Sequence, residues 1–275
     1  MSGMGRASLT LLVAAVLPGL MACTAGPPAA TAASSTASTP TPITAATTPT
    51  ATAPTPTVDE IVAAHVAARG GADRLHALRS MRAKGLAMMA GGKVAPVVRE
   101  IARPGRIRLE ITYQGLSSVY AHDGKVGWQV APLQGHFEPE RLPDEVSAPS
   151  VDQLDIEGPL VDWKAKGHTV RLVGRTKVGD REAYDLELHL ASGAVRHDFI
   201  DAETFLLLRT DVERVVGGRK VPLEMTFGDY RSVDGIVYPF LIETRRRGRP
   251  QGLKFVVKTI ELNPAIDEAR FQLPR

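Results

Sequence analysis

The residue types that most often carry out chemistry in enzymes are few and scattered in this chain. Its 275 residues include one cysteine and seven histidines, and no serine lies in the Gly-x-Ser-x-Gly pattern of α/β-hydrolase nucleophiles. The glycine patterns of Rossmann folds and of phosphate-binding loops do not occur. Carboxylates are many, but a glycosidase pair is defined by a separation in space that a sequence does not contain. We therefore predict no catalytic residue, no cofactor, and a protein that is not an enzyme.

A metal site is not predicted either. No two histidines have the His-x-x-x-His spacing that places two ligands on one helix face, and there are no cysteine ligands for structural zinc. His189 and His197 flank the turn Ser192-Gly193 and could be cross-strand neighbours, but we favour an ordinary pair of surface or core histidines. The histidines are His65, His76, His122, His136, His168, His189 and His197.

The single cysteine, Cys23, ends a segment typical of exported proteins. Arg6 is followed by an uncharged apolar stretch, 7–22, which is short for a membrane span and has the length of a signal peptide. Leu20-Met21-Ala22-Cys23 resembles the lipobox of bacterial lipoproteins, in which the chain is cut before the cysteine and the thiol is acylated. The resemblance implies a signal peptide at 1–22 and a lipid anchor on Cys23. An ordinary signal peptide with an incidental cysteine is the alternative.

Such an anchor would place the protein in a cell envelope. Because Thr24 rather than aspartate follows the cysteine, resemblance to Gram-negative sorting signals favours the periplasmic face of the outer membrane over the inner membrane. Residues 24–56 are mostly Thr, Ala, Pro and Ser, without a charge. This composition cannot bury enough apolar surface to offset the entropy lost on ordering, so we predict that 23–56 is a lipidated, disordered tether. An O-glycosylated stalk would also act as a spacer.

The remaining chain, 57–275, is predicted to be one mainly β domain of the α+β class. Its clearest strand is 184–190, where apolar and polar residues alternate strictly and Leu186 and Leu188 share one face. Similar runs occur between 82 and 130 and between 169 and 262. The latter stretch has no segment long enough to be a crossover helix, so its strands should be antiparallel. About eleven strands are predicted, and a sheet of this many strands should curl or split.

Helices are expected at the start of the domain and in an insert. Thr57 can cap a helix with an acidic first turn, and Gly70-Gly71 ends it. A second short helix is expected at 72–78. Between 132 and 166 the strand pattern stops and the segment is acidic and contains proline. Within it, 159–166 is predicted to be a short helix that could lie over the sheet.

Four segments of the domain resemble the LolA/LolB-like family of outer-membrane lipoprotein-sorting proteins, which are periplasmic lipoprotein carriers. The resemblance covers about 58–274 and implies an unclosed, curved antiparallel sheet around a lipid-sized cavity, with helices covering its concave face. The soluble carrier of that family has no lipobox and its outer-membrane acceptor has one, so an anchored chain is closer to an acceptor, or to anchored lipid binders of related fold. The segments are 61–71 with Leu75, 200–209, 230–240 (Tyr-Arg-Ser-Val-Asp-Gly-Ile-Val-Tyr-Pro-Phe) and 271–274 (Phe-Gln-Leu-Pro).

If the sheet curls, apolar residues on one face become the lining of this lipid-binding cavity. The candidates are mostly aliphatic or thioether side chains, which suit an acyl chain. The alternative is that the same residues fill a solid core. The candidates are Ile107, Leu109, Ile111, Trp128, Leu186, Leu188, Phe199, Leu223, Met225, Phe227, Phe240, Ile242, Phe255 and Val257.

A basic run of four arginines ends one predicted strand. It could contact anionic headgroups or an acidic partner, or it could be a solvated hairpin tip. The run consists of Arg245, Arg246, Arg247 and Arg249.

Two functions remain open at this stage. In the first, a membrane-anchored envelope domain binds lipid or the acyl chains of a lipoprotein and takes part in their sorting or transfer. In the second, a surface-tethered sensor or structural module binds a protein and has a filled core without a ligand. The 33 basic and 30 acidic residues leave a net charge of only +3, which argues against a nucleic-acid partner. We expect a monomer.

Overall fold

The structure is a computed structural model that describes residues 55–143, 147, 154–216 and 219–274. The predicted signal peptide, Cys23 and nearly all of the predicted tether lie outside these residues. No helix in the described part of the chain is long and apolar enough to cross a membrane.

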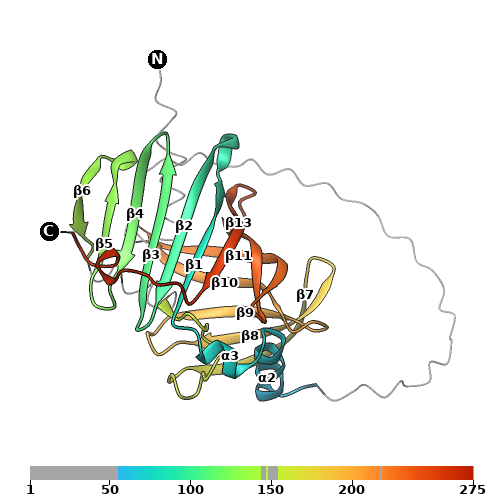
Figure 1. Cartoon of the computed structure of the whole chain (residues 1–275). Coiled ribbons are helices and arrows are strands. Elements are labelled where there is room, and N and C mark those ends of the chain that lie inside the picture. Colours follow the sequence, from blue (N-terminus) through green and yellow to red (C-terminus); the bar gives the residue numbers. More distant parts are fainter. Residues whose placement is uncertain (1–54, 144–146, 148–153, 217–218, 275) are drawn as a thin grey trace, which may run out of the picture.

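All strands of the described chain join one antiparallel sheet made of two meanders (Figure 1). The first meander runs from the middle of the sheet to one edge: β1 (Ser80–Met88), β2 (Val94–Ala102), β3 (Arg106–Tyr113), β4 (Leu116–His122), β5 (Gly127–Ala131) and β6 (His136–Arg141). The second starts at the other edge and returns to the middle: β7 (Thr169–Val178), β8 (Arg181–His189), β9 (Val195–Asp201), β10 (Leu207–Val216), β11 (Arg219–Val233), β12 (Ile236–Arg246) and β13 (Gly252–Leu262). Because β13 pairs with β1, the insert between β6 and β7 connects the two outer edges.

The sheet is strongly twisted and unclosed. In Figure 1 strands β7 to β10 lie across the direction of β2 to β6, and the edge strands β6 and β7 do not pair with each other. The predicted mainly β, antiparallel, unclosed sheet is therefore confirmed. The count of about eleven strands is wrong, because the described sheet has thirteen. One missed strand, β6, is a short edge strand that contains Pro139 and exposes Phe137, so no buried face imposes an alternating pattern on it.

One irregularity of the sheet lies where the two meanders meet, between β1 and β13. The register of β1 against β13 shifts between Lys84 and Gly85. A Cβ atom at Gly85 would lie 2.3 Å from the carbonyl oxygen of Val256, so only glycine fits this approach. A bulge of this kind bends the strand and increases its twist. The centre of the sheet is therefore bent.

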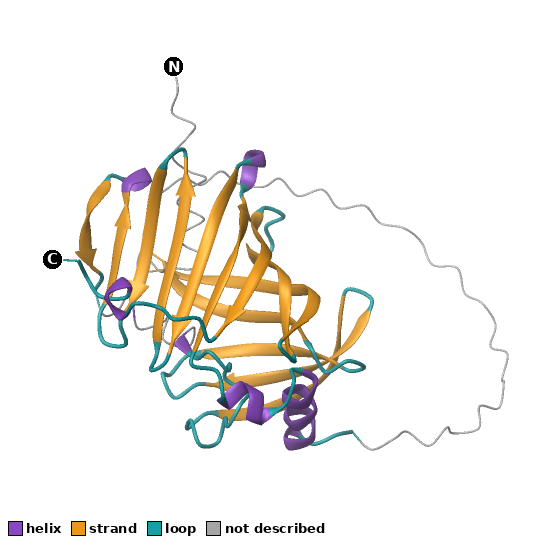
Figure 2. Ribbon diagram, viewed as in Figure 1, coloured by secondary structure: helices purple, strands orange, loops and turns teal. Residues whose placement is uncertain are grey.

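Two short helices pack at the β7 to β9 end of the sheet (Figure 2). Helix α2 (Val58–Ala68) begins with the predicted cap, since Thr57 and Glu60 form a reciprocal capping box. It buries Ile61 and Val62 against β8. Helix α3 (Ala72–His76) is shorter than the predicted 72–78.

The helix predicted at 159–166 is wrong. The segment is a series of turns, because Asp162 has φ 49°, a left-handed conformation that interrupts a right-handed helix. Its apolar residues still have the predicted covering role. Leu160 and Trp163 pack into the cluster formed by α2 and β8.

Candidate functional site

A partly open cavity of about 340 Å³ lies between the two halves of the sheet. Strands β1 to β3 line one side, and β10 to β13 line the other. His65 of α2, Arg69 directly after this helix, Arg196 of β9 and four residues of the insert also line it; the four are Asp155, Ile156, Gly158 and Pro159. Cavities that take small ligands typically measure about 300–1,000 Å³, so this one has room for a small ligand.

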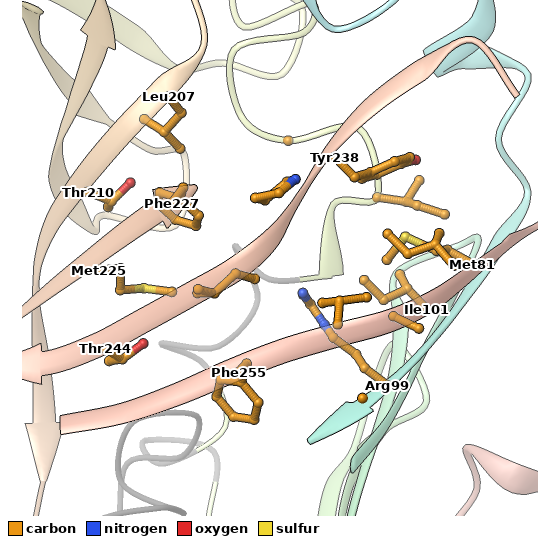
Figure 3. Close-up of a pocket in the computed structure, with 18 of the residues that line it drawn as sticks. Met81, Arg99, Ile101, Leu207, Thr210, Met225, Phe227, Tyr238, Thr244 and Phe255 are labelled. Carbon is orange, nitrogen blue, oxygen red and sulfur yellow. The ribbon is translucent and has the colours of Figure 1, made fainter. Parts of the chain in front are cut away.

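Half of the predicted lining residues surround this cavity. They come from both meanders, and Figure 3 shows Met225, Phe227 and Phe255 around the same space. Their part in binding a lipid stays a prediction. The seven are Ile107, Leu109, Met225, Phe227, Ile242, Phe255 and Val257.

Leu186 and Leu188 lie instead in a solid cluster beneath α2. Both are fully buried, and they pack with Ile61 and Val62 of the helix. The strand pattern identified their buried face correctly. It does not reveal that α2 fills the space above that face.

Three more candidates do not line the cavity. Ile111 packs with the group that contains Leu253, and Leu223 packs with Val212 and Val221. The indole nitrogen of Trp128 donates a hydrogen bond of 2.7 Å to the carbonyl oxygen of Phe271. The closing segment 271–274 is thereby attached to the first meander.

The last two candidates, Phe199 and Phe240, lie under arginine side chains. The guanidinium carbon of Arg209 is 3.9 Å from the ring centre of Phe199, and that of Arg231 is 4.7 Å from the ring centre of Phe240. Each ring thus stacks against a cation, and neither residue lines the cavity.

Several cavity residues were not predicted. Val97 and Ile101 share a face of β2 and pair with Ile111 and Ile107 across the β2–β3 hairpin. The turn at Pro104-Gly105 sets that register, so a pairing argument could have found them. The larger apolar and aromatic lining residues that were not predicted are Met81, Leu86, Val97, Ile101, Ile156, Leu206, Leu207, Val212, Tyr230, Val237, Tyr238, Val256 and Ile260.

The cavity also contains polar groups held by the surrounding chain. His65 is 5% exposed, and its Nδ1 donates a hydrogen bond of 2.8 Å to the carbonyl oxygen of Phe205. Burial, aided by the positive charge of Arg69, lowers the pKa of His65 to about 4, so the imidazole is neutral at pH 7. Burial raises the pKa of Tyr238 to about 12 and keeps its phenol protonated.

Three of the four segments that resemble the sorting family meet at α2. His65 of the first segment bonds to Phe205 of the second. The amide of Val237 in the third donates a hydrogen bond of 3.0 Å to the carbonyl oxygen of Arg69. Gly70 has φ 116°, and a Cβ atom there would lie 2.2 Å from the carbonyl oxygen of Gly235. The glycine is needed because the β11–β12 turn approaches the end of the helix so closely.

The basic run at the end of β12 is partly engaged within the protein. Arg245 donates to Glu224, and Arg247 donates a hydrogen bond of 2.6 Å to Asp211. Arg246 and Arg249 are exposed. A role for the run in contacting headgroups or a partner stays a prediction.

His189 and His197 are not cross-strand neighbours. His189 pairs with Val195, and His197 pairs with Glu187. Both imidazoles face the Glu187 carboxylate, at 3.0 Å and 3.7 Å. The two histidines therefore make ordinary contacts with the carboxylates of Glu187 and Asp185.

One group in the described chain has the spacing of metal ligands: His76, Glu157 and Asp162. The carboxylate of Glu157 already binds Arg103 and Lys166, and His76 lies 2.7 Å from Asp162. These partners occupy the ligand atoms, so we assign no metal to the group.

Comparison with solved structures identifies the fold. A LolA superfamily protein from Nitrosomonas europaea matches with a TM-score of 0.50 and 13% identity, over 79% of this chain and 98% of that one. The chain has the LolA-type fold. A putative outer membrane lipoprotein-sorting protein domain from Vibrio parahaemolyticus matches with a TM-score of 0.53 and 10% identity, over 77% and 94% of the two chains. No family model and no curated protein matches the sequence.

The predicted resemblance is thus confirmed as a shared fold. The LolA-type fold here combines an unclosed sheet with a cavity between its halves. Identities of 10–13% leave the ligand to be argued from the cavity of this chain.

Proposed function

We propose that this domain is a non-catalytic carrier or acceptor that binds an acyl chain in its cavity. The observation that supports this most directly is the cavity of about 340 Å³, whose wall is built from aliphatic and aromatic side chains of both meanders. Burial of an acyl chain contributes roughly 0.8 kcal/mol per CH₂ group. Transfer between two such proteins needs no catalyst, because it follows the difference in affinity between the two cavities.

The proposed setting is a bacterial cell envelope, with the outer membrane favoured. Residues 1–22 would be the signal peptide, Cys23 the lipid anchor, 24–56 the tether and 57–275 the binding domain. A flexible tether of this length would span roughly 30 Å, which gives the domain reach above the membrane surface. The domain would then act as a lipid or lipoprotein acceptor close to the membrane that holds it.

The alternative function, a protein-binding module with a filled core, has less support. It requires the concave face to be packed solid. A cavity at this position argues against that packing, although the part beneath α2 is filled by Leu186 and Leu188.

Native mass spectrometry tests the proposed function. The chain from Thr24 onward keeps every residue that the structure describes, and behind a signal peptide without a lipobox it can be exported to a bacterial periplasm and purified without detergent. We expect a co-purified lipid or acyl species at near one per chain, identified after extraction. A mass without ligand, unchanged after incubation with lipid, would contradict acyl binding and restore the protein-binding alternative.

A further inference from the structure

Arg99 places a positive charge in the middle of the apolar cavity wall. It lies on β2 between Val97 and Ile101, which share its face of the strand. Its partners across the sheet are Ala83 on β1 and Leu109 on β3. All four neighbours line the cavity, and Figure 3 shows the guanidinium extending from β2 into it.

Other charged groups of the wall have partners. Arg69 donates to the carbonyl oxygen of Glu157, Arg196 bonds to Asp198, and Asp155 lies 2.7 Å from Lys166.

For Arg99, no hydrogen bond or ion pair occurs with any residue that the structure describes. Burial lowers the pKa of its guanidinium, but arginine stays protonated in proteins. A half-buried charge without a partner in the described chain is unfavourable, and an anion at this position would reduce that cost.

We infer that Arg99 binds the anionic group of the ligand, so that the cavity takes an acidic amphiphile with a carboxylate or a phosphate. This inference rests on the proposed function and names its ligand class. The planar guanidinium can donate two parallel hydrogen bonds to either anion. Ala83, directly opposite, leaves space beside it. The acyl chain would then lie against Leu109, Phe227 and Phe255.

The charge of Arg99 also distinguishes between two classes of ligand that are both compatible with the fold: the acyl chains of lipoproteins and free acidic lipids. The acyl chains of a lipoprotein are joined to its cysteine by ester, amide and thioether groups, none of which is charged. A fatty acid or an acidic phospholipid carries the anion that Arg99 lacks. The cavity is therefore better matched to a free acidic lipid than to the acyl chains of a lipoprotein.

Three probes with the same sixteen-carbon chain test the inference: palmitate, hexadecyl phosphate and the neutral hexadecanol. Their affinities are measured on the chain from Thr24 onward by displacement of a fluorescent fatty acid. We expect both anions to bind at least about tenfold more tightly than hexadecanol, as a charge-assisted hydrogen bond predicts. Arg99→Met should abolish the preference and keep hexadecanol binding, whereas Arg99→Lys should retain part of it. Arg79→Met, which removes an exposed arginine outside both the cavity and the basic run, is the matched control and should change nothing.

Equal affinity of the wild-type chain for all three probes would overturn the role of Arg99 and leave the proposed function standing. This comparison needs no variant, so it decides the question even if Arg99→Met does not fold. An anion preference that survives in folded Arg99→Met would also overturn it. If acetate or inorganic phosphate displaced the fluorescent fatty acid at the same concentration, the ligand would be a simple anion, and the inferred acidic amphiphile would be overturned. Failure of every sixteen-carbon probe to bind would overturn the proposed function itself.

Discussion

Arg99 and Glu100 are adjacent on β2 and face opposite sides of the sheet. Glu100 is 1% exposed and accepts hydrogen bonds of 2.9 Å from Arg82 and Arg270. Burial opposes ionisation of the Glu100 carboxyl, but the hydrogen bonds from these two arginines outweigh it and lower its pKa. The same strand thus carries a compensated charge away from the cavity and, on the cavity side, a charge without a partner in the described chain.

Opposite stability effects are expected at these two positions. Glu100→Gln leaves two arginines without their buried partner and should lower the free energy of unfolding by roughly 2–4 kcal/mol. Arg99→Met removes a half-buried cation that has no partner in the described chain, so it should leave the free energy of unfolding unchanged or slightly higher without lipid. Urea unfolding of delipidated protein at pH 7 measures both. If Arg99→Met lowered the free energy of unfolding as much as Glu100→Gln does, this would show that Arg99 has a structural partner.

A charge in the cavity should block acyl binding without unfolding the protein. Phe227 faces the cavity on β11, while its neighbour Thr226 faces the other side of the strand. Phe227→Lys should weaken palmitate binding more than tenfold, because a desolvated ammonium would replace an apolar contact. Thr226→Lys is the matched control and should bind normally. Normal binding by a folded Phe227→Lys variant would count against the cavity as the lipid site.

The cluster beneath α2 should matter for stability and not for binding. Leu186 is fully buried there, away from the cavity. Leu186→Ala should destabilise the protein by about 3 kcal/mol, through lost burial and the space left behind. Val195→Ala, at a side chain that is 44% exposed on the neighbouring strand, should have little effect. A change in palmitate affinity at equal fraction folded would place Leu186 at the ligand site instead.

Acid should destabilise the protein through His65. Its pKa falls from 6.5 to about 4 on folding, so between these values the unfolded chain binds more protons and stability decreases as pH falls. This residue alone should remove about 2 kcal/mol between pH 7 and pH 5. His65→Asn keeps a donor near Phe205 and should show a correspondingly smaller pH dependence in urea unfolding. His122 and His168 shift in the same direction and remain in both proteins, so the difference between the two slopes isolates His65. Identical slopes would contradict a buried neutral imidazole.

Acylation of Cys23 can be tested by metabolic labelling. Cells grown with tritiated palmitate should label the wild-type chain and leave Cys23→Ala unlabelled, because the anchor requires the thiol. Label that persists in the variant would exclude this cysteine as the only acylation site, and an unlabelled wild type would support an ordinary signal peptide.

The strands and the first helix of the domain were predictable because they depend on local patterns of residues. Alternation along 184–190 and Thr57 as a cap reflect the geometry of a single strand or helix, and the structure contains both elements. The turns at 159–166 were not predictable in this way. The left-handed Asp162 interrupts a segment whose composition suits a helix.

By itself, the sequence determined which strand faces are apolar and that neighbouring strands are antiparallel, since both follow from side-chain alternation and short connections. Only the tertiary structure decided which apolar faces surround a cavity. Leu186 and Phe227 have the same kind of pattern, yet α2 covers the first, and the bend at Gly85 accompanies a cavity beside the second. The role of Arg99 likewise could not be predicted from the sequence alone. Its charge is evident in the sequence, but the lack of a partner within the described chain depends on residues distant along the chain that only folding brings together.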